Sequence, residues 1–307
     1  MRRRMTHCGM AFMLVSAWAC PLASANENAT GAEPLVRVNR YVITRTDFDL
    51  ACLVRGIEES QRPGIQRRLL ERLVEERLMA DFLASRRVKA SASALDAQVE
   101  QIYSLLQRLG KEPNQFLEEL GINETLLRET LSLPLAWKAY MSTVVPDQKL
   151  REEYEAHRRE LDGTKLQARH IVIKVAPDAA EEAWIDAEHR IEKVREQIAS
   201  DETTFADAAK QFSEGPSADA GGDVGFFPFR GIMSAPFADV AFALKTGELS
   251  PVVRTAAGVH LIEVTDEQPG QLSLEDVRPA VFERISQRMW DQQVAELRSR
   301  AKVEWIE

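Results

Sequence analysis

QARHIVIKV (167–175) and GVHLIEV (258–264) are the two stretches that decide how the middle of this chain folds. Each places a histidine at the head of an apolar run: Ile-Val-Ile follows His170, and Leu-Ile follows His260. Short runs rich in β-branched residues predict buried strands. Since both histidines occupy the same place on similar strands, they must be weighed as core residues, as metal ligands and as parts of a reactive site.

The residues around these two strands predict a compact α+β domain. A segment rich in glycine and turn residues, SEGPSADAGGDVGFFPFRG (213–231), interrupts its helical patterns. The expected elements are, in chain order, a strand at 166–175, helices at 179–200, 203–212 and 236–244, and strands at 251–254 and 259–265.

The sequence before this domain is mostly helical. Residues 35–161 contain one strand pattern, LVRVNRYVIT (35–44), and about six helical segments. Asn114, Asn123 and Asp147 are placed to begin three of these helices, because their side chains accept hydrogen bonds from free N–H groups of a first turn.

The sequence after this domain predicts one long helix and a last strand. Ser273 and Asp276 resemble a capping box, from which a helix runs to about Arg300, and AKVEWI (301–306) follows as a strand. Such a helix cannot bury its apolar stripe alone, so we expect it to pack on the N-terminal helices, with VEWI pairing to LVRV. The middle domain is then an insertion in a domain made from both ends of the chain.

The first 25 residues have the composition of a secretory signal peptide. Arg2–Arg4 form a basic head, residues 8–20 are apolar, and Ala23-Ser24-Ala25 fits a cleavage site. The apolar run is short for a membrane span, which takes about 20 residues, and no other segment could cross a membrane. We therefore expect an exported, periplasmic protein; a lipid anchor on Cys20 and a buried N-terminal helix are the alternatives.

Charge and cysteine content narrow the possible partners. Residues 1–25 hold three of the 39 Lys and Arg and none of the 48 Asp and Glu, so their removal leaves (39 − 3) − 48 = −12. An acidic exported protein is poorly suited to nucleic acid or anionic lipid. Cys52 is the one cysteine outside residues 1–25, so no internal disulfide can form, and we expect it to be a small core residue.

Most kinds of reactive site lack their motifs. A zinc site needs three or four ligands, and His170, His189 and His260 come without a CxxC or HxxxH pair. There is no GxSxG serine, and GGDVG (221–225) lacks the Gly-Lys-Ser/Thr of a phosphate loop. We expect neither a metal nor a cofactor. A pair of core histidines bonded to each other or to the backbone remains open.

Apolar rings cluster near the histidines in a chain that is otherwise poor in aromatic residues. These rings belong to Phe226, Phe227, Phe229 and Phe237, and Met233 lies in the same stretch of sequence. A pocket floored by Met and Phe and bordered by imidazole suits a small apolar ring such as proline.

Three consecutive stretches carry a family resemblance: ARHIVIK, FADAAKQFSEGPSADAGGDVGFF and MSAPFADVAFALKTGELSPVVRTAAGVHLIEV. They resemble the parvulin-type (PpiC, rotamase) peptidyl-prolyl isomerase domain of exported foldases of the PrsA and SurA type. The resemblance covers residues 166–265, and the flanks resemble the two halves of a SurA-type chaperone domain. It implies a four-stranded antiparallel sheet with helices, inserted in a mostly helical domain. The expected limits are 1–25 for the signal peptide, 26–162 and 271–307 for the chaperone domain, and 166–266 for the isomerase domain.

The resemblance also implies roles for single residues. His170 and His260 are the paired pocket histidines, and Thr255 is a hydroxyl that hydrogen-bonds with them. Met233 and Phe237 are the floor for the proline ring. On the second strand, Val224 and Phe227 match wall positions. Two positions depart from strong catalysts of the family: Gly215 replaces a cysteine or aspartate, and Ala257 replaces a serine.

The leading hypothesis is therefore an exported isomerase and chaperone that binds unfolded or partly folded exported proteins at X-Pro segments. Gly215 and Ala257 support a competing hypothesis, in which the domain grips peptides without catalysis. A third is an assembly factor for one exported enzyme or complex. No nucleic acid partner and no integral membrane segment in the mature chain are expected.

Overall fold

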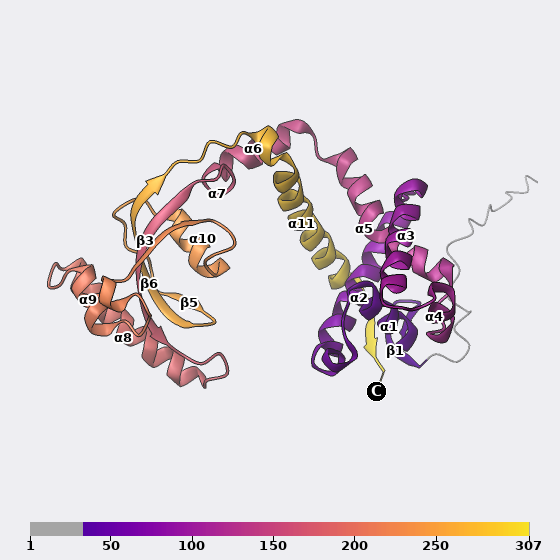
Figure 1. Cartoon of the computed structure of the whole chain (residues 1–307), viewed down its shortest axis with the longest axis horizontal. Coiled ribbons are helices and arrows are strands. Elements are labelled where there is room, and N and C mark those ends of the chain that lie inside the picture. The colour runs from indigo at the N-terminus through magenta and orange to yellow at the C-terminus, as the bar shows by residue number, and fades with distance from the viewer. Residues whose placement is uncertain (1–32, 307) are drawn as a thin grey trace, which may run out of the picture. The chain divides into compact units, whose positions relative to one another are not determined.

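The computed structural model describes residues 33–306, and they form two compact units (Figure 1). One unit takes the chain up to Tyr140 together with Gln292–Glu307, and the other takes Met141–Asp291. The expected signal peptide and Cys20 lie outside the described residues. The domain limits expected from the sequence, 26–162 and 166–266, stay predictions.

The first unit, called the helical unit, joins both ends of the chain through a small sheet of order β2-β1-β7. In β1, Val36 pairs with Trp305 of β7, so the expected pairing of LVRV with VEWI is confirmed. Arg67 lies over the Trp305 ring at 3.4 Å. The elements of this unit are β1 (Pro34–Val38), β2 (Tyr41–Thr44), α1 (Arg45–Val54), η1 (Glu59–Gln61), α2 (Arg62–Ser85), α3 (Ala92–Arg108), α4 (Pro113–Glu119), most of α5 (Glu124–Val144), the end of α11 (Leu274–Arg300) and β7 (Val303–Trp305).

Buried apolar side chains explain why these elements pack. Val36, Phe48 and Val74 are at most 1% exposed in a core shared by the sheet, α1 and α2. Cys52 lies in the same core as a free thiol, as expected, and burial raises its pKa. A second core joins α3, α4 and α5 around Leu127.

Two expectations for local structure were wrong. Residues 35–44 are a hairpin and not one strand, because Asn39 turns the chain with a φ of 54°, a conformation that asparagine tolerates better than most residues. Asn114 lies inside α4, which is capped by the Glu112 carboxylate accepting from the Gln115 N–H. The helix expected to begin at Asp147 is present and runs over Asp147–Ala156.

The second unit, called the sheet unit, is built on a four-stranded antiparallel sheet of order β4-β3-β6-β5. The expected fold class, an α+β domain inserted in a mostly helical one, is confirmed. The elements of this unit are α6 (Asp147–Ala156), α7 (Arg158–Leu161), β3 (Lys165–Lys174), α8 (Glu181–Ala199), α9 (Phe205–Phe212), η2 (Ala218–Ala220), β4 (Asp223–Pro228), α10 (Ala235–Ala243), β5 (Val253–Thr255), β6 (Gly258–Gln268) and most of α11.

Helices cover both faces of this sheet, and alternation along the strands decides which side chains each face receives. Ile171, Ile173 and Leu261 point to the face covered by α8 and α9. Ala168 and Ile262 point to the face covered by α10. His170 is two residues from Ala168 on β3, and His260 is two residues from Ile262 on β6, so both imidazoles lie on the α10 face.

A buried carboxylate fastens α11 to α6. The Glu153 side chain is 7% exposed and accepts hydrogen bonds from Arg288 at 2.9 Å and from Arg284 at 3.0 Å. Hydrogen bonding to Arg288, the largest cause, lowers the pKa of Glu153. The capping box of Ser273 and Asp276 at the start of α11 is present as expected.

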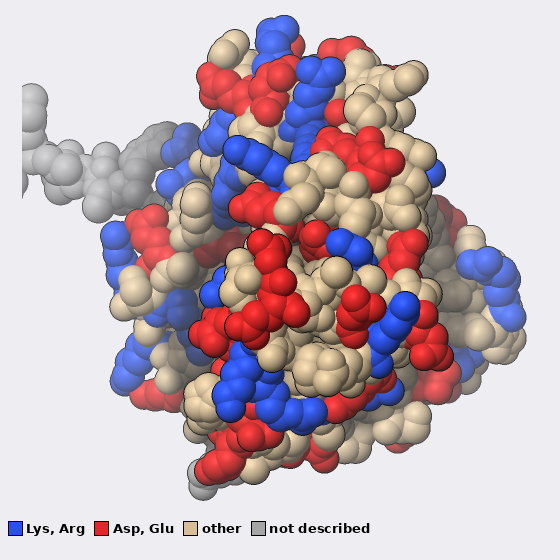
Figure 2. Space-filling view, turned by 90° about the vertical axis from the view of Figure 1, so that its left-hand side faces the viewer, with Lys and Arg blue, Asp and Glu red and all other residues tan. Residues whose placement is uncertain are grey.

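The surface carries charges of both signs. Figure 2 shows acidic and basic side chains interleaved on one face, without a continuous basic area. Among residues 33–306, no helix is long and apolar enough to cross a membrane.

Candidate functional site

The register of β3 and β6 brings the two histidines together. His170 lies opposite Ile262, and His260 lies opposite Val172, so the two imidazoles are diagonal neighbours on one face. Their Nδ1 atoms are 3.2 Å apart, and the rings are nearly parallel, with an interplanar angle of 24°. The pairing that the family resemblance implies is therefore present as a direct contact.

A hydroxyl extends this contact into a short chain of hydrogen bonds. Thr255 Oγ1 lies 2.8 Å from Nε2 of His260 and also accepts the N–H of Ala257 at 3.1 Å. Since a neutral imidazole carries one N–H, the chain can run in two directions. When Thr255 donates to His260, His260 donates to His170, whose Nε2 then carries a proton. In the reverse direction His260 donates to Thr255, and Nε2 of His170 is an acceptor.

Burial keeps both imidazoles neutral. His260 is 5% exposed, and desolvation, assisted by the neighbouring His170, lowers its pKa to about 4. Desolvation also lowers the pKa of His170. A positively charged imidazole in this place would lack a counter-ion, since its partner is a second base. The pair therefore fixes shape and hydrogen bonding at neutral pH and carries no charge.

Aromatic rings line the apolar side of the site. Phe237 lies with its ring edge-on to both imidazoles, at centroid distances of 5.7 Å from His170 and 5.8 Å from His260. It is 3% exposed and contacts the fully buried Phe227. Met233 and Val224 are partly buried and pack against the same cluster. The structure thus brings these four predicted residues to the same face as the histidines.

Glycine is required where the loop between α9 and β4 approaches His170. A Cβ on Gly215 would lie 2.7 Å from Cγ1 of Val172 and 3.5 Å from Nε2 of His170. A Cβ on Gly222 would lie 2.5 Å from the His170 carbonyl, and the Gly222 carbonyl accepts the His170 N–H at 2.9 Å. The loop therefore passes directly beside the first imidazole, and the departure at Gly215 leaves no side chain there.

Ser213 is a contributor that sequence reasoning missed. Its hydroxyl accepts the N–H of Val172 at 3.2 Å and that of Gly215 at 3.3 Å. The next residue, Glu214, donates its N–H to the Val172 carbonyl at 2.8 Å. These bonds fix the loop to β3. The only signal in the sequence was a serine directly after a helix, which is too common to identify a role.

The site can bind and orient a ligand, and it shows no means of covalent catalysis. No serine or cysteine side chain hydrogen-bonds to either imidazole, and no cluster of His, Cys, Asp and Glu within residues 33–306 could hold a metal ion. What remains is an apolar, aromatic surface next to a neutral hydrogen-bonding pair. Such a site suits a small uncharged ring attached to an amide.

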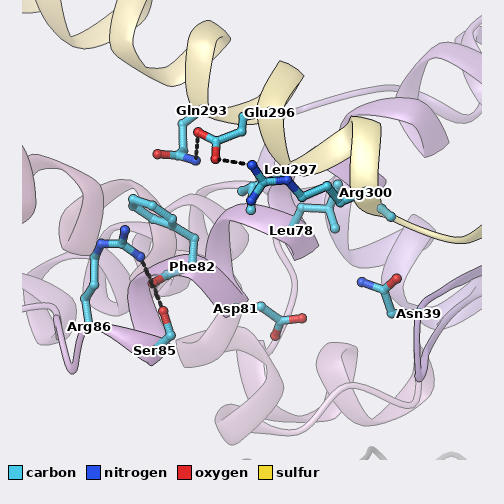
Figure 3. Close-up of a pocket in the computed structure, with 11 residues that line it drawn as sticks. Asn39, Leu78, Asp81, Phe82, Ser85, Arg86, Gln293, Glu296, Leu297 and Arg300 are labelled. Atoms are coloured by element: carbon cyan, nitrogen blue, oxygen red, sulfur yellow. Dashed lines mark hydrogen bonds and ion pairs between the residues drawn. The ribbon is translucent and has the colours of Figure 1, made fainter.

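A separate groove of about 410 Å³ lies in the helical unit, between α2 and the end of α11 (Figure 3). Leu78 and Phe82 from α2 face Leu297 from α11 across it. Its rim is charged and engaged internally, as in the ion pair of Glu296 with Arg300 at 3.1 Å. Because the groove holds no imidazole and lies in the other unit, it is not the histidine site.

Comparison with known proteins gives three findings. Residues 170–266 match the model of the rotamase family, described as a PPIC-type PPIASE domain. The chain is 36% identical over 118 residues to the peptidyl-prolyl cis-trans isomerase Pin1 of Digitalis lanata and covers 99% of it, using 34% of its own length. A crystal structure of the peptidylprolyl isomerase PrsA from Bacillus cereus aligns with a TM-score of 0.46 at 24% identity, covering 90% of this chain and 95% of that one.

Longer relatives are matched only in part. Foldase protein PrsA 4 of Bacillus cereus is 30% identical over 201 residues, which are 64% of this chain and 64% of the relative. Chaperone SurA of Alkalilimnicola ehrlichii is 29% identical over 267 residues, which are 82% of this chain and 60% of the relative. The chain therefore spans somewhat less than two thirds of these two relatives.

Proposed function

Because the chain belongs to the PPIC-type peptidyl-prolyl cis-trans isomerase family, we propose that its sheet unit catalyses rotation about X-Pro bonds in unfolded proteins. The contact of His170 with His260 above the Phe237 ring carries this proposal. The proline ring of a client packs on Phe237 and Met233, with Val224 as the wall, and the fully buried Phe227 supports Phe237 from behind. Thr255 holds the imidazole pair in place.

The reaction needs no bond to be broken. An X-Pro amide must lose its partial double-bond character over a barrier of roughly 18–20 kcal/mol. A catalyst has only to bind the twisted amide more tightly than either planar form, and each tenfold gain in rate needs about 1.4 kcal/mol of this preference. A dry surface that holds the ring while the preceding carbonyl rotates supplies it.

The histidines take part as neutral groups. Their lowered pKa values exclude a standing positive charge at neutral pH. Nε2 of His170 can donate to the client or accept from it, depending on the direction of the hydrogen-bond chain through His260 and Thr255. No proton has to be abstracted from the client.

The helical unit is proposed to hold the client chain while the sheet unit acts on its prolines. This division of labour is supported by the similarity of the chain to relatives named foldase and chaperone. With the export signal expected at residues 1–25, we propose that the protein acts in the periplasm, on partly folded exported proteins. Lipid anchoring through Cys20 remains the alternative for its location.

A purely binding role is the second candidate function. It is favoured by Gly215, which brings no polar side chain to the imidazole pair. In that case the protein prevents client aggregation without accelerating isomerisation.

Refolding of a client with a slow, proline-limited phase separates these two functions. Phe237→Leu removes the ring beneath the imidazoles. Phe205→Leu is the matched control, because Phe205 is equally buried (2% against 3% exposed) on the opposite face of the same sheet. We expect wild type and Phe205→Leu to accelerate the slow phase and suppress aggregation, and Phe237→Leu only to suppress aggregation. Suppression without acceleration by wild type would overturn the isomerase proposal in favour of the binding role.

A further inference from the structure

An arginine from outside the matched isomerase segment binds the end of the helix that carries Phe237. Arg159 lies in the four-residue helix α7, ahead of residues 170–266, which match the family model. Its Nη1 atom donates to the carbonyl of Phe242 at 2.7 Å and to that of Leu244 at 2.5 Å. Both carbonyls belong to the C-terminal end of α10. Another part of the chain therefore supplies a side-chain cap for this helix.

This cap suits the chemistry of a helix end. The last four carbonyls of a helix have no partner within it, and a positive charge beside them interacts favourably with the helix dipole. The Nη2 atom of Arg159 donates in turn to the Glu267 carboxylate at 2.7 Å, which holds the guanidinium in place. Glu267 follows residues 170–266 directly, so both members of this ion pair come from the flanks of the matched segment.

The opposite end of α10 is fixed less firmly by polar contacts. Ser234 is its N-cap residue, and the Ser234 side chain makes no capping hydrogen bond. The preceding loop contains Gly231, with a φ of 95°, and Ile232, which is 64% exposed. Exposed loops are more mobile than the elements that they connect. The contact with Arg159 is therefore the stronger polar restraint on the position of α10.

Packed aromatic rings connect the capped end of α10 to the histidine pair. The Phe242 ring lies edge-on to Phe227 at a centroid distance of 6.2 Å, and Phe227 lies edge-on to Phe237 at 5.8 Å. Phe237 is in turn edge-on to both imidazoles. All three phenylalanines are buried, and close-packed interiors transmit a shift of one side chain to its neighbours. A displacement of the helix end would therefore reach the surface proposed to bind proline.

The helix that supplies Arg159 is itself fixed, so it can serve as an anchor. Glu160, the next residue of α7, accepts a hydrogen bond from Nη1 of Arg284 on α11 at 2.6 Å. After α7, the Thr164 hydroxyl donates to the buried Asp162 carboxylate at 2.6 Å. These bonds hold α7 against α11 and against the start of β3.

We propose that Arg159 is a positioning residue of the isomerase site: by holding the C-terminal end of α10, it sets the place of Phe237 and so strengthens the binding of X-Pro segments. This inference rests on the proposed function and adds to it a residue from outside the matched isomerase segment. The site is then complete only together with α7.

The test variant is Arg159→Met, which keeps an unbranched side chain and removes the hydrogen bonds. One capped X-Pro peptide is used with the full-length mature protein. NMR measures kcat and KM of cis-trans exchange, the Kd of the peptide by titration, and the methyl shift of Met233, which packs beside Phe237. We expect KM and Kd to rise at least about fivefold, with a smaller change in kcat and a moved Met233 signal, because small misplacements of a binding surface are costly.

Three further variants make the test specific. Arg195→Met is the matched control, because Arg195 pairs with Glu192 within α8, on the opposite face of the sheet, and we expect wild-type KM. Glu267→Gln removes only the ion pair, and we expect at most about a twofold rise in KM, since partly exposed ion pairs contribute little. Arg159→Lys keeps the charge and a donor, and we expect it to restore part of the affinity.

Two results would overturn the positioning role. The first is a wild-type KM, Kd and Met233 shift in Arg159→Met, whatever its stability. The second is a rise in KM in Glu267→Gln as large as that in Arg159→Met, because the ion pair and not the cap of α10 would then carry the effect. If Arg159→Met does not fold, Arg159→Gln, a shorter neutral side chain, takes its place with the same expected and contradicting results.

The measurements keep this inference separate from the proposed function. If wild type binds the peptide without accelerating exchange, the isomerase proposal fails, and the ratio of the two Kd values for wild type and Arg159→Met still decides the role of Arg159. Absence of both binding and exchange in wild type would overturn the two proposals together.

Discussion

Acidification should destabilise the sheet unit through His260. The imidazole of an unfolded chain takes up a proton below its ordinary pKa of 6.5, whereas the buried His260 stays neutral down to about 4. The unfolded state therefore binds more protons than the folded state in this window. The contribution of the neutral His260 to the free energy of unfolding is fully present above pH 6.5 and is lost as the pH falls from 6.5 to 4. From pH 7.5 to 5.0 the loss amounts to about 2 kcal/mol, out of a maximum of about 3 kcal/mol below pH 4.

The matched perturbation is His260→Asn, which keeps a polar side chain but cannot be protonated in this range. Because the protein has two units, global unfolding is a poor measure. Hydrogen exchange of the buried amides of Ile171 and Leu261 reports the opening free energy of the sheet unit alone. We expect wild type to lose about 2 kcal/mol more than His260→Asn between pH 7.5 and 5.0. Equal losses in the two proteins, or an NMR titration of His260 near pH 6.5, would refute the reasoning.

Three further changes test the packing around the site and in the α6–α11 contact. Thr255→Val should cost about 1–3 kcal/mol, because it leaves Nε2 of the buried His260 without its partner; Thr255→Ser should restore most of it, as measured by hydrogen exchange of the Ile171 and Leu261 amides and by imidazole ¹⁵N shifts. Gly215→Ala should cost about 1–3 kcal/mol through its clash with Val172, and Gly215→Ala with Val172→Ala should recover part of this loss; a single variant as stable as wild type would contradict the clash. Glu153→Gln should cost about 2 kcal/mol in the opening free energy of the sheet unit from hydrogen exchange, because the partly exposed Arg284 and Arg288 lose the buried carboxylate that binds both, and no loss would contradict that role for the carboxylate.

The two central strands and the insertion could be predicted because local patterns specify them. Apolar runs after His170 and His260 predicted the two strands, whereas the pairing of the imidazoles was implied by the family resemblance and depends on the register of β3 with β6. The insertion followed from the long final helix, which has an apolar stripe that one chain end cannot cover. These predictions depend on the spacing of apolar residues and on the length of each segment, which tertiary contacts do not alter.

The remaining features depend on contacts between distant residues or on a single backbone angle. The hairpin at Asn39 rests on one positive φ within a run that otherwise alternates like a strand. At α4, the carboxylate of Glu112, two residues before Asn114, caps the helix in its place. Ser213 acts only because β3, which is distant in sequence, offers it the N–H of Val172. Such partners come together only in the folded chain, so no local sequence pattern predicts them.

The central claim is that the surface of Phe237 beneath the two histidines speeds rotation about X-Pro bonds. NMR exchange spectroscopy of one capped X-Pro peptide at pH 7.5 measures this rate directly, with catalytic amounts of wild type, Phe237→Leu and Phe205→Leu. We expect exchange well above that in buffer for wild type and Phe205→Leu, and a loss of at least about tenfold in Phe237→Leu, equivalent to about 1.4 kcal/mol of transition-state binding. Exchange in the presence of wild type that equals exchange in buffer would contradict the claim.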